Sequence, residues 1–297
     1  MKKLSCLLSA ISYKHLEPLF AELERRNLAY AVVKGEVLSI LCYCEEGKRN
    51  PHDVDLLIEK KNVHIVESIL ASIGFVTVSQ QRAKRIAMLS LTHQTSPWIK
   101  KIGSIGIIEL DINFDFFWGQ YEGARIDISA ILSNFMHVNV FGIKIRTLSY
   151  LYSFVHLVLH HFKDLNSIYL LVTKNSYRYE LFQDVYAFFS KQKHNLPINE
   201  LMLICQSMNI CPYMYYILYY TNYLFCDAEL QQYVESFYSE EGAALLEQYG
   251  LTEKERRPWK CSFETRLAAK NIYDLIKEDL TVDDLQVIIK NNELLST

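Results

Sequence analysis

The chain has 297 residues, of which 50% are hydrophobic and 22% are charged, and its formal net charge is −3. This composition is typical of a folded globular protein with one large domain or two modest ones, and it excludes a disordered or fibrous chain. The mildly acidic balance provides no whole-surface electrostatic basis for binding nucleic acid, so we expect no nucleic-acid partner.

Cysteine usage and hydropathy indicate a cytoplasmic protein without a membrane partner. The seven cysteines are an odd number without regular spacing, which favours free thiols in a reducing compartment over a disulfide framework. The apolar stretch after Lys3 is interrupted at residues 13–15 and lacks a cleavage pattern, so an amphipathic first helix is expected. The most apolar later run, residues 211–226, is shorter than the roughly 20 residues that a membrane span needs.

The first quarter of the chain alternates between helical and strand patterns. Gly35, Gly47 and Gly74, together with Pro18 and Pro51, are the punctuating residues. The expected elements are a helix around 16–23 with Pro18 in its first turn, a strand at 28–33, a short helix at 36–44, a polar loop at 45–52, a strand at 53–58 and a helix at 63–73.

After residue 74 the hydrophobic period changes to two. Strands are expected at 75–79, 85–93 and 104–118, with a hairpin connection around 96–103, and one more short hairpin at 137–148. From residue 149 onward the pattern is helical almost without interruption. The expected fold class is therefore α+β, with a mixed-sheet domain at 1–147 followed by a mostly α-helical domain at 148–297.

A pair of acids stands inside the second expected strand, in "RNPHDVDLLI". Side chains two apart on a strand point to the same face, so Asp53 and Asp55 can converge on one cation. Burying a charge is costly unless it is paired or binds a metal, and two carboxylates with substrate oxygens suit Mg²⁺. Taken alone, the pair favours an exposed strand face, because such pairs occur by chance in many strands and loops.

Two further features favour a metal site. "VVKG" ends a strand about twenty residues before the pair, and a glycine there lets backbone amides approach a phosphate. "IELDIN" carries Glu109 and Asp111 at alternate positions of another strand. A third carboxylate beside a bound metal could hold a second ion or take a proton from an attacking hydroxyl.

This layout resembles the DNA polymerase β-like nucleotidyltransferase superfamily, with its strand and glycine, helix, arginine-containing loop, D-x-D-L-L strand and later carboxylate. More narrowly, residues 15–118 are similar to a poorly characterised bacterial nucleotidyltransferase family that reads roughly "LKG…L…R…D-x-D-L-L-V…GF". That family's "(V/I)-D-L-H-W" stretch is matched by "LDINF" at residues 110–114. The likeness continues weakly into the helical half, in "HLVLHHF" and "LFQDVYAFF".

The resemblance implies a polymerase β-like core and a Mg²⁺-dependent transfer of a nucleoside monophosphate from a nucleoside triphosphate, with release of pyrophosphate. ATP is the default donor, and the acceptor is a hydroxyl or similar group on a small molecule or a protein. Two Mg²⁺ ions would stabilise the attacking and leaving oxygens. The resemblance assigns the metal-binding and catalytic roles to Asp53, Asp55 and Asp111, and the phosphate contacts to Lys34, Gly35 and Arg49.

The sequence departs from the family pattern at two positions. Glu36 follows the glycine, where the superfamily usually has Ser or Gly, and this puts a carboxylate beside the expected phosphate site. Asn113 replaces the histidine that usually follows the third Asp, and Glu109 competes with Asp111 for the third carboxylate role. The alternatives are a catalytically inactive nucleotidyltransferase-like binding, antitoxin or accessory protein, and a helical interaction protein with a chance D-x-D.

The helical half holds weaker candidates. His156 and His160 have metal-ligand spacing on a helix but lack a Glu motif or a third ligand, so packing histidines compete with zinc ligands. Asp184 could pair with one of the histidines, shape the acceptor site or lie on a helix surface. One stripe of tyrosines could form an aromatic wall or part of the core: Tyr213, Tyr216, Tyr220 and Tyr223.

Overall fold

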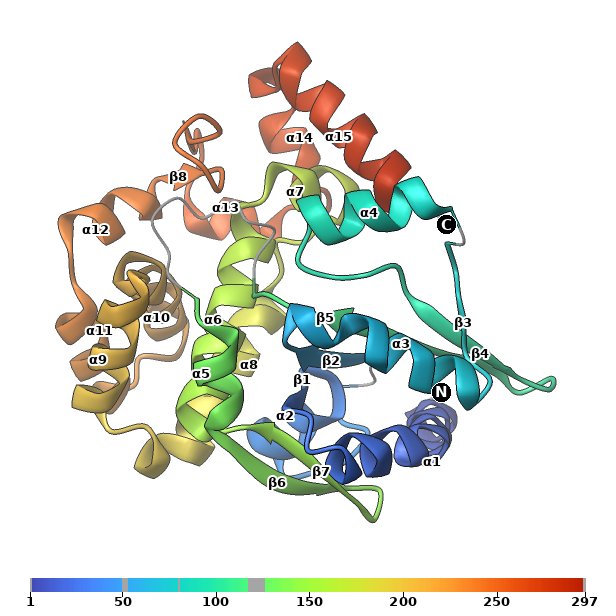
Figure 1. Cartoon of the computed structure of the whole chain (residues 1–297). Coiled ribbons are helices and arrows are strands. Elements are labelled where there is room, and N and C mark those ends of the chain that lie inside the picture. The colour runs from blue at the N-terminus through green and yellow to red at the C-terminus, as the bar shows by residue number, and fades with distance from the viewer. Residues whose placement is uncertain (1, 50–52, 80, 117–125, 296–297) are drawn as a thin grey trace. The chain divides into compact units, whose positions relative to one another are not determined.

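The computed structural model describes residues 2–49, 53–79, 81–116 and 126–295 of the chain (Figure 1). These residues form two compact units, one of 2–116 with 126–153 and one of 154–295. The fold class is α+β, as expected: the first unit contains a mixed five-stranded sheet, and the second consists almost entirely of helices.

The first unit contains most of the strands. Its elements are α1 (Lys2–Arg25), β1 (Tyr30–Val33), α2 (Gly35–Tyr43), β2 (Val54–Ile58), η1 (Lys60–Asn62), α3 (Val63–Ser72), β3 (Val76–Thr77), α4 (Arg82–Leu91), β4 (Trp98–Ile102), β5 (Gly106–Asn113), α5 (Ile128–Ser133), β6 (Phe135–Val140), β7 (Ile143–Leu148) and the first residues of α6 (Tyr150–Asn166).

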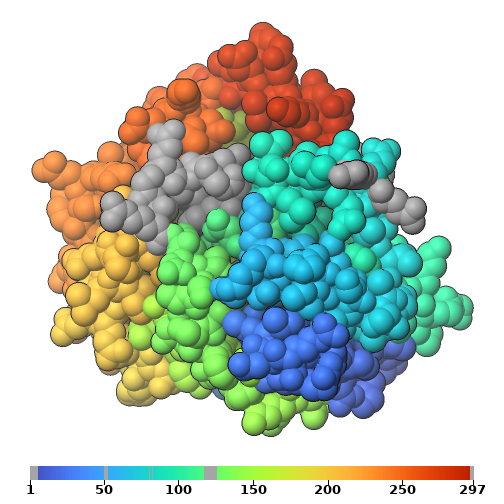
Figure 2. All heavy atoms as spheres, in the orientation of Figure 1, coloured from blue at the N-terminus to red at the C-terminus, as the bar shows by residue number. Residues whose placement is uncertain are grey.

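The five-stranded sheet runs in the order β1-β2-β5-β4-β3. Only the central pair, β2 with β5, is parallel, and the other neighbours are antiparallel. Every residue of β1 and β2 is buried. The helices α1 and α3 pack against each other, and Figure 2 shows them side by side on one face of this unit, α1 in dark blue and α3 in lighter blue. The middle of the sheet therefore lies in the core of the unit.

The second unit is helical apart from one pair of two-residue strands. Its elements are the remainder of α6, α7 (Ile168–Lys174), α8 (Tyr179–Gln192), η2 (Lys193–Asn195), α9 (Ile198–Met208), α10 (Cys211–Phe225), α11 (Ala228–Phe237), α12 (Glu240–Leu246), β8 (Gln248–Tyr249), β9 (Arg257–Pro258), α13 (Phe263–Ala268), α14 (Tyr273–Ile276), η3 (Lys277–Asp279) and α15 (Val282–Leu295). Among the described residues, no helix combines the length and the apolar character needed to cross a bilayer.

Most of the predicted elements are present, and three expectations were wrong. The strand expected at 85–93 is helix α4, because "RAKRIAMLSL" is built from strong helix formers, whose preference prevails over an alternating pattern. Pro18 lies inside the long helix α1 rather than in its first turn. The last two residues of the strand expected at 104–118 lie outside the described residues.

The third error concerns the connection expected at 96–103. Most of it is strand β4, which pairs with β5 from Trp98 opposite Leu110 to Ile102 opposite Gly106. The turn directly follows β4, at Gly103, whose φ of 48° is in the left-handed region that glycine adopts without strain. Pro97 therefore precedes the strand and does not mark the turn.

Candidate active site

Three aspartates are brought together by strands β2 and β5. The two strands are parallel, and the Cα of Asp55 is paired with the Cα of Asp111. Paired residues on neighbouring strands share a face of the sheet. Asp53 directly precedes β2, and its charge is close enough to Asp111 to raise the pKa of that carboxyl. Asp55 is 5% exposed, and the other two carboxylates are partly buried. The fold thus brings together three acids that the sequence places 58 residues apart at most.

Two side chains donate hydrogen bonds to the central carboxylate. Oδ1 of Asp55 accepts one bond of 2.8 Å from Nζ of Lys34 and another of 3.1 Å from Nδ2 of Asn113. Lys34 reaches Asp55 because it follows Val33, which is paired with Asp55 in the antiparallel β1–β2 ladder. Sequence reasoning treated Asn113 only as a departure from a family pattern. Its position two residues after Asp111, on the same strand face, was the signal that could have identified it.

Burial and mutual repulsion raise the pKa values of the clustered acids. The pKa of Asp111 is raised from 3.8 to about 8, first by burial and then by the negative charges of Asp55 and Asp53, while Lys34 opposes the shift. The pKa of Asp53 is also raised, again by burial and then by Asp55. Such a group of carboxylates disfavours its own full ionisation, and a nearby cation would relieve that cost.

The donor set fits a hard divalent cation. Oδ1 of Asp111 is buried and has no hydrogen-bond partner among the described residues. An unsatisfied buried carboxylate oxygen is costly, and two or three carboxylates with remaining positions open to water or phosphate are the ligands that Mg²⁺ prefers. Asp53, Asp55 and Asp111 could therefore hold such an ion.

A helix begins beside the acids, at the Lys34–Gly35 step. Both residues have positive φ values, 58° at Lys34 and 39° at Gly35, and α2 starts at Gly35. Backbone amides at a helix N-terminus are available to an anion, and the helix dipole favours negative charge there. The chain thus places a helix N-terminus, where an anion could bind, next to a group of carboxylates that could hold a cation.

One oxygen of the Glu36 carboxylate accepts a hydrogen bond from the loop after α2. Glu36 is fully buried, and its Oε2 accepts a 2.7 Å hydrogen bond from the backbone N–H of Gly47. In the same loop the backbone N–H of Arg49 donates to Oγ of Ser39, at 3.1 Å. Glu36 therefore holds the segment that carries Arg49, a role that the sequence did not suggest.

Glu109 and Asp111 share one face of β5, but their surroundings differ. Glu109 is paired in register with Ile99 of the neighbouring strand β4, whereas Asp111 is paired with Asp55 of β2. The negative charge of Glu109 raises the pKa values of both Asp53 and Asp111, although it is the smaller influence on each. Asp111 is thus the acid directly opposite the D-x-D strand.

A second polar cluster lies in the helical unit. Ligand atoms of His160, His161 and Asp164 all lie within 4.8 Å of one another, so among the described residues this cluster includes His160 of the predicted pair but not His156. Asp184 is buried, and its Oδ2 lies 3.9 Å from Nε2 of His161, so it faces a histidine, which was one of the three sequence interpretations.

The predicted tyrosine stripe belongs to the core. Tyr213, Tyr216 and Tyr220 are at most 5% exposed, and only Tyr223 is exposed, at 53%. Phe162 packs against Tyr213 and Tyr216, with ring centroids 4.5 and 5.2 Å apart. An aromatic wall made of this stripe was therefore the wrong alternative, because the packing of α10 buries that face.

Among the comparisons with known proteins, the match to a family model identifies the family. No curated protein matches the sequence. One solved structure, an antigenic nucleotidyltransferase-like protein from Paracoccidioides brasiliensis, is similar with a TM-score of 0.35 and 16% identity, over 63% of this chain and 75% of that one. The model of a family described as uncharacterised nucleotidyltransferases matches residues 9–226, and the chain belongs to that family.

Proposed function

We propose that this protein is an active Mg²⁺-dependent nucleotidyltransferase. It transfers a nucleoside monophosphate from a nucleoside triphosphate, ATP by default, to a hydroxyl or similar group on a small molecule or a protein, and it releases pyrophosphate. The observation that carries the proposal is the β2–β5 register, in which Asp111 stands opposite Asp55, with Asp53 directly before β2. The transfer chemistry belongs to residues 1–147, in a cytoplasmic protein, and residues 148–297 form the helical domain.

The proposed roles follow from chemistry at each position. Asp53 and Asp55 hold two Mg²⁺ ions, and Asp111 completes the metal site. When bound, the ions supply charge neutralisation for the triphosphate and the leaving pyrophosphate. Asp111 would assist the acceptor hydroxyl by taking its proton, because a bound cation would favour the ionised form of a carboxyl whose pKa is otherwise raised to about 8.

The phosphates are held by the start of α2 and its surroundings. The backbone at Gly35 offers N–H groups to a phosphate, and Lys34 and Arg49 contribute positive charge to it. Lys34 now donates to Asp55, so it is positioned within reach of the metal-binding carboxylates and can exchange that partner for a phosphate oxygen when substrate enters.

The function is tested by offering the purified protein each α-labelled nucleoside triphosphate with Mg²⁺ and a panel of acceptors that includes extracts. We expect triphosphate binding and transfer of label by the wild type. Asp53→Asn and Asp55→Asn should abolish transfer, and Asp111→Asn should reduce it far more than Glu109→Gln. Asp283→Asn, at an exposed acid of α15, is the matched control and should leave transfer unchanged.

Three outcomes distinguish the proposed enzyme from its alternatives and Asp111 from Glu109 as the third carboxylate. Triphosphate binding without transfer of label to any acceptor would favour the inactive binding protein. If the wild type neither binds nor transfers, and the Asp53→Asn and Asp55→Asn variants are indistinguishable from it, the enzyme assignment fails. If Glu109→Gln is the more damaging variant, the third carboxylate is Glu109.

A further inference from the structure

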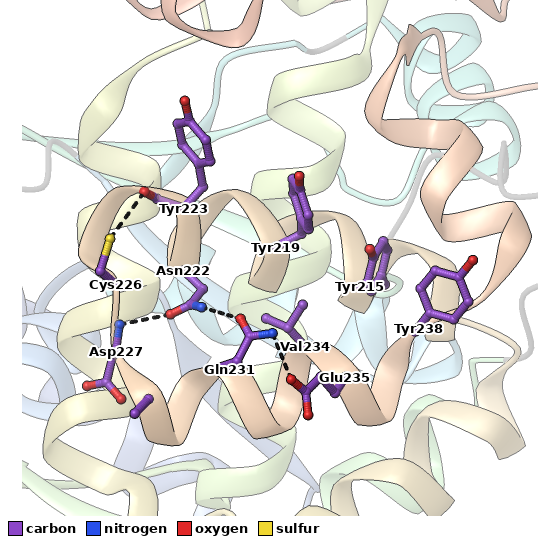
Figure 3. A pocket seen from close by; sticks show the side chains of 11 residues that line it. Tyr215, Tyr219, Asn222, Tyr223, Cys226, Asp227, Gln231, Val234, Glu235 and Tyr238 are labelled. Atoms are coloured by element: carbon purple, nitrogen blue, oxygen red, sulfur yellow. Dashed lines mark hydrogen bonds between the residues drawn. The ribbon is translucent and has the colours of Figure 1, made fainter.

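A groove of about 690 Å³ lies in the helical unit, between α10 and α11 (Figure 3). Four tyrosines line it: Tyr215, Tyr219 and Tyr223, spaced four residues apart along α10, and Tyr238 just after α11. Residues four apart lie on the same side of a helix. Apart from Tyr223, the exposed member of the predicted stripe, these rings differ from the buried ones, and they form an aromatic surface along the groove.

Neighbouring rings contact one another, and two of the four are exposed. Tyr215 packs against Tyr219 and Tyr238, with ring centroids 5.7 and 5.6 Å apart. Tyr215 is buried, whereas Tyr223 and Tyr238 are 53% and 60% exposed. The face of a tyrosine ring carries the negative part of its quadrupole, so a row of partly open rings attracts a cation.

The other wall is a directed chain of hydrogen bonds that ends on a carboxylate. Nδ2 of Asn222 donates to Oε1 of Gln231 at 2.6 Å, and Nε2 of Gln231 donates to Oε1 of Glu235 at 2.9 Å (Figure 3). Each amide group thus donates one N–H hydrogen bond along the chain that leads to Glu235. The chain of hydrogen bonds thus ends on one exposed negative charge, that of Glu235.

The remaining carboxylate of the groove already has a structural role. Oδ1 of Asp227 caps α11 by accepting hydrogen bonds from the backbone N–H groups of Glu229 and Leu230, at 2.8 and 3.0 Å, and its Oδ2 accepts one from the Tyr186 hydroxyl at 3.2 Å. Glu235 is therefore the acid with acceptor capacity left for a ligand.

The charge balance selects the class of ligand. None of the described residues that line the groove is basic, while two are acidic. Nothing there compensates a phosphate or a carboxylate, so nucleotides and other anions are disfavoured. The pKa of Tyr215 is raised by burial and by its neighbouring tyrosines, and that of Tyr223 by Glu264, which is the response of phenols in surroundings that resist added negative charge.

We propose that this groove is a binding site for a small organic cation, an amine or quaternary ammonium compound with an attached apolar ring or chain. The cationic head lies against the tyrosine faces within reach of Glu235, and the apolar part lies along the row of rings. The site is distinct from the aspartate group, because all of the residues that line it belong to the helical unit.

Isothermal titration of the full-length protein with three probes of similar shape tests the proposal. Benzyltrimethylammonium carries the positive charge, benzyl alcohol is neutral and benzoate is negative. We expect benzyltrimethylammonium to bind about tenfold or more tightly than benzyl alcohol, the ratio that one favourable cation–π contact with a nearby carboxylate supports, and benzoate not to bind.

Variants locate the binding. Tyr223→Leu removes an aromatic face at an exposed position, and Glu235→Gln removes the charge while keeping the hydrogen bond from Gln231, so both variants should fold. Each should weaken binding of benzyltrimethylammonium several-fold. Tyr179→Leu and Glu200→Gln change an exposed tyrosine and an exposed acid of the same unit outside the groove, and they should bind like the wild type.

The proposal is overturned if benzyltrimethylammonium does not bind, or if benzyl alcohol or benzoate binds equally tightly. It is also overturned if Tyr223→Leu and Glu235→Gln both bind the cation as the wild type does. Unchanged cation binding in Asp53→Asn is expected, and a loss of binding there would contradict the independence of the two sites.

Discussion

Nζ of Lys34 lies 2.8 Å from Oδ1 of Asp55, so the residue that precedes α2 neutralises the carboxylate in the centre of the sheet. The side chain of Asp55 is 6% exposed and that of Lys34 is 20% exposed. In the metal-free protein this pair compensates a buried charge at the point where we propose that Mg²⁺ binds.

The pair leads to a first prediction, for Lys34→Met. The variant leaves Asp55 with Asn113 as its remaining donor among the contacts described above. Its free energy of unfolding should fall by about 2–3 kcal/mol in the presence of a chelator, because a buried charge loses its partner. Excess Mg²⁺ should restore part of the loss. Urea unfolding followed by circular dichroism measures both effects.

Lys61→Met is the control for Lys34→Met. Lys61 also pairs with a carboxylate, that of Glu59 at 3.0 Å, but its side chain is 73% exposed. Solvent screens such a pair, so the expected loss is about 0.5 kcal/mol or less. Equal losses in the two variants would show that the Lys34–Asp55 pair is not a buried one.

The pKa of Asp111 predicts how stability depends on pH. The group has a pKa of about 8 in the folded protein and 3.8 as the ordinary value, so between these pH values the folded state binds more protons than the unfolded state. Stability must then fall as pH rises through that window, and it changes no further above the folded pKa.

The measurement compares wild type with Asp111→Asn in chelator. From about pH 5 to about pH 8 the wild type should lose roughly 1–3 kcal/mol more than the variant, which has no proton to release at this position. Parallel stability curves for the two proteins would mean that Asp111 titrates in its ordinary range. Mg²⁺ should bind more tightly at the upper end of the window, because it requires the ionised carboxylate.

Glu36 provides a test of whether a carboxylate next to Gly35 harms phosphate binding. Its Oε2 accepts from Gly47, so Glu36→Gln keeps an acceptor there whereas Glu36→Ala does not. We expect Glu36→Gln to bind ATP within about twofold of the wild type, and Glu36→Ala to lose about 2–3 kcal/mol of stability from the unsatisfied amide and the cavity.

Titration with a fluorescent ATP analogue and urea unfolding are the measurements for the Glu36 variants. Binding of ATP that is about tenfold tighter in Glu36→Gln than in the wild type would contradict this account, since it would mean that the carboxylate repels the triphosphate.

Arg266 stabilises the helical unit through aromatic rings. It is 2% exposed, its guanidinium lies 5.0 Å from the ring centroid of Trp259 and 5.3 Å from that of Tyr220, and Nη2 donates to the Tyr220 hydroxyl at 2.8 Å. Lysine cannot reproduce a planar group stacked on rings, so Arg266→Lys should cost about 2–4 kcal/mol.

Thermal and urea unfolding of Arg266→Lys measure that cost. Arg178→Lys, at an exposed position of the same unit, should change the free energy of unfolding by about 0.5 kcal/mol or less. Comparable stability of the two variants would show that the guanidinium of Arg266 is replaceable by any cation.

The sequence by itself determined the local features of the site. The acids at Asp53 and Asp55, the glycine after the first strand and the alternate acids at Glu109 and Asp111 were all readable, because strand periodicity and backbone freedom are properties of neighbouring residues. The same holds for the α+β class and for the helical second half, where long runs of one period leave little ambiguity.

Tertiary structure decided which partners these residues meet. The order β1-β2-β5 puts Asp111 beside Asp55, and no local pattern encodes strand order. The donors from Lys34 and Asn113, and the binding of Glu36 to Gly47, likewise join residues from separate elements. The choice of tyrosine stripe that faces the core depended on packing. A side chain's environment is set by contacts between elements, and those contacts exist only once the chain has folded.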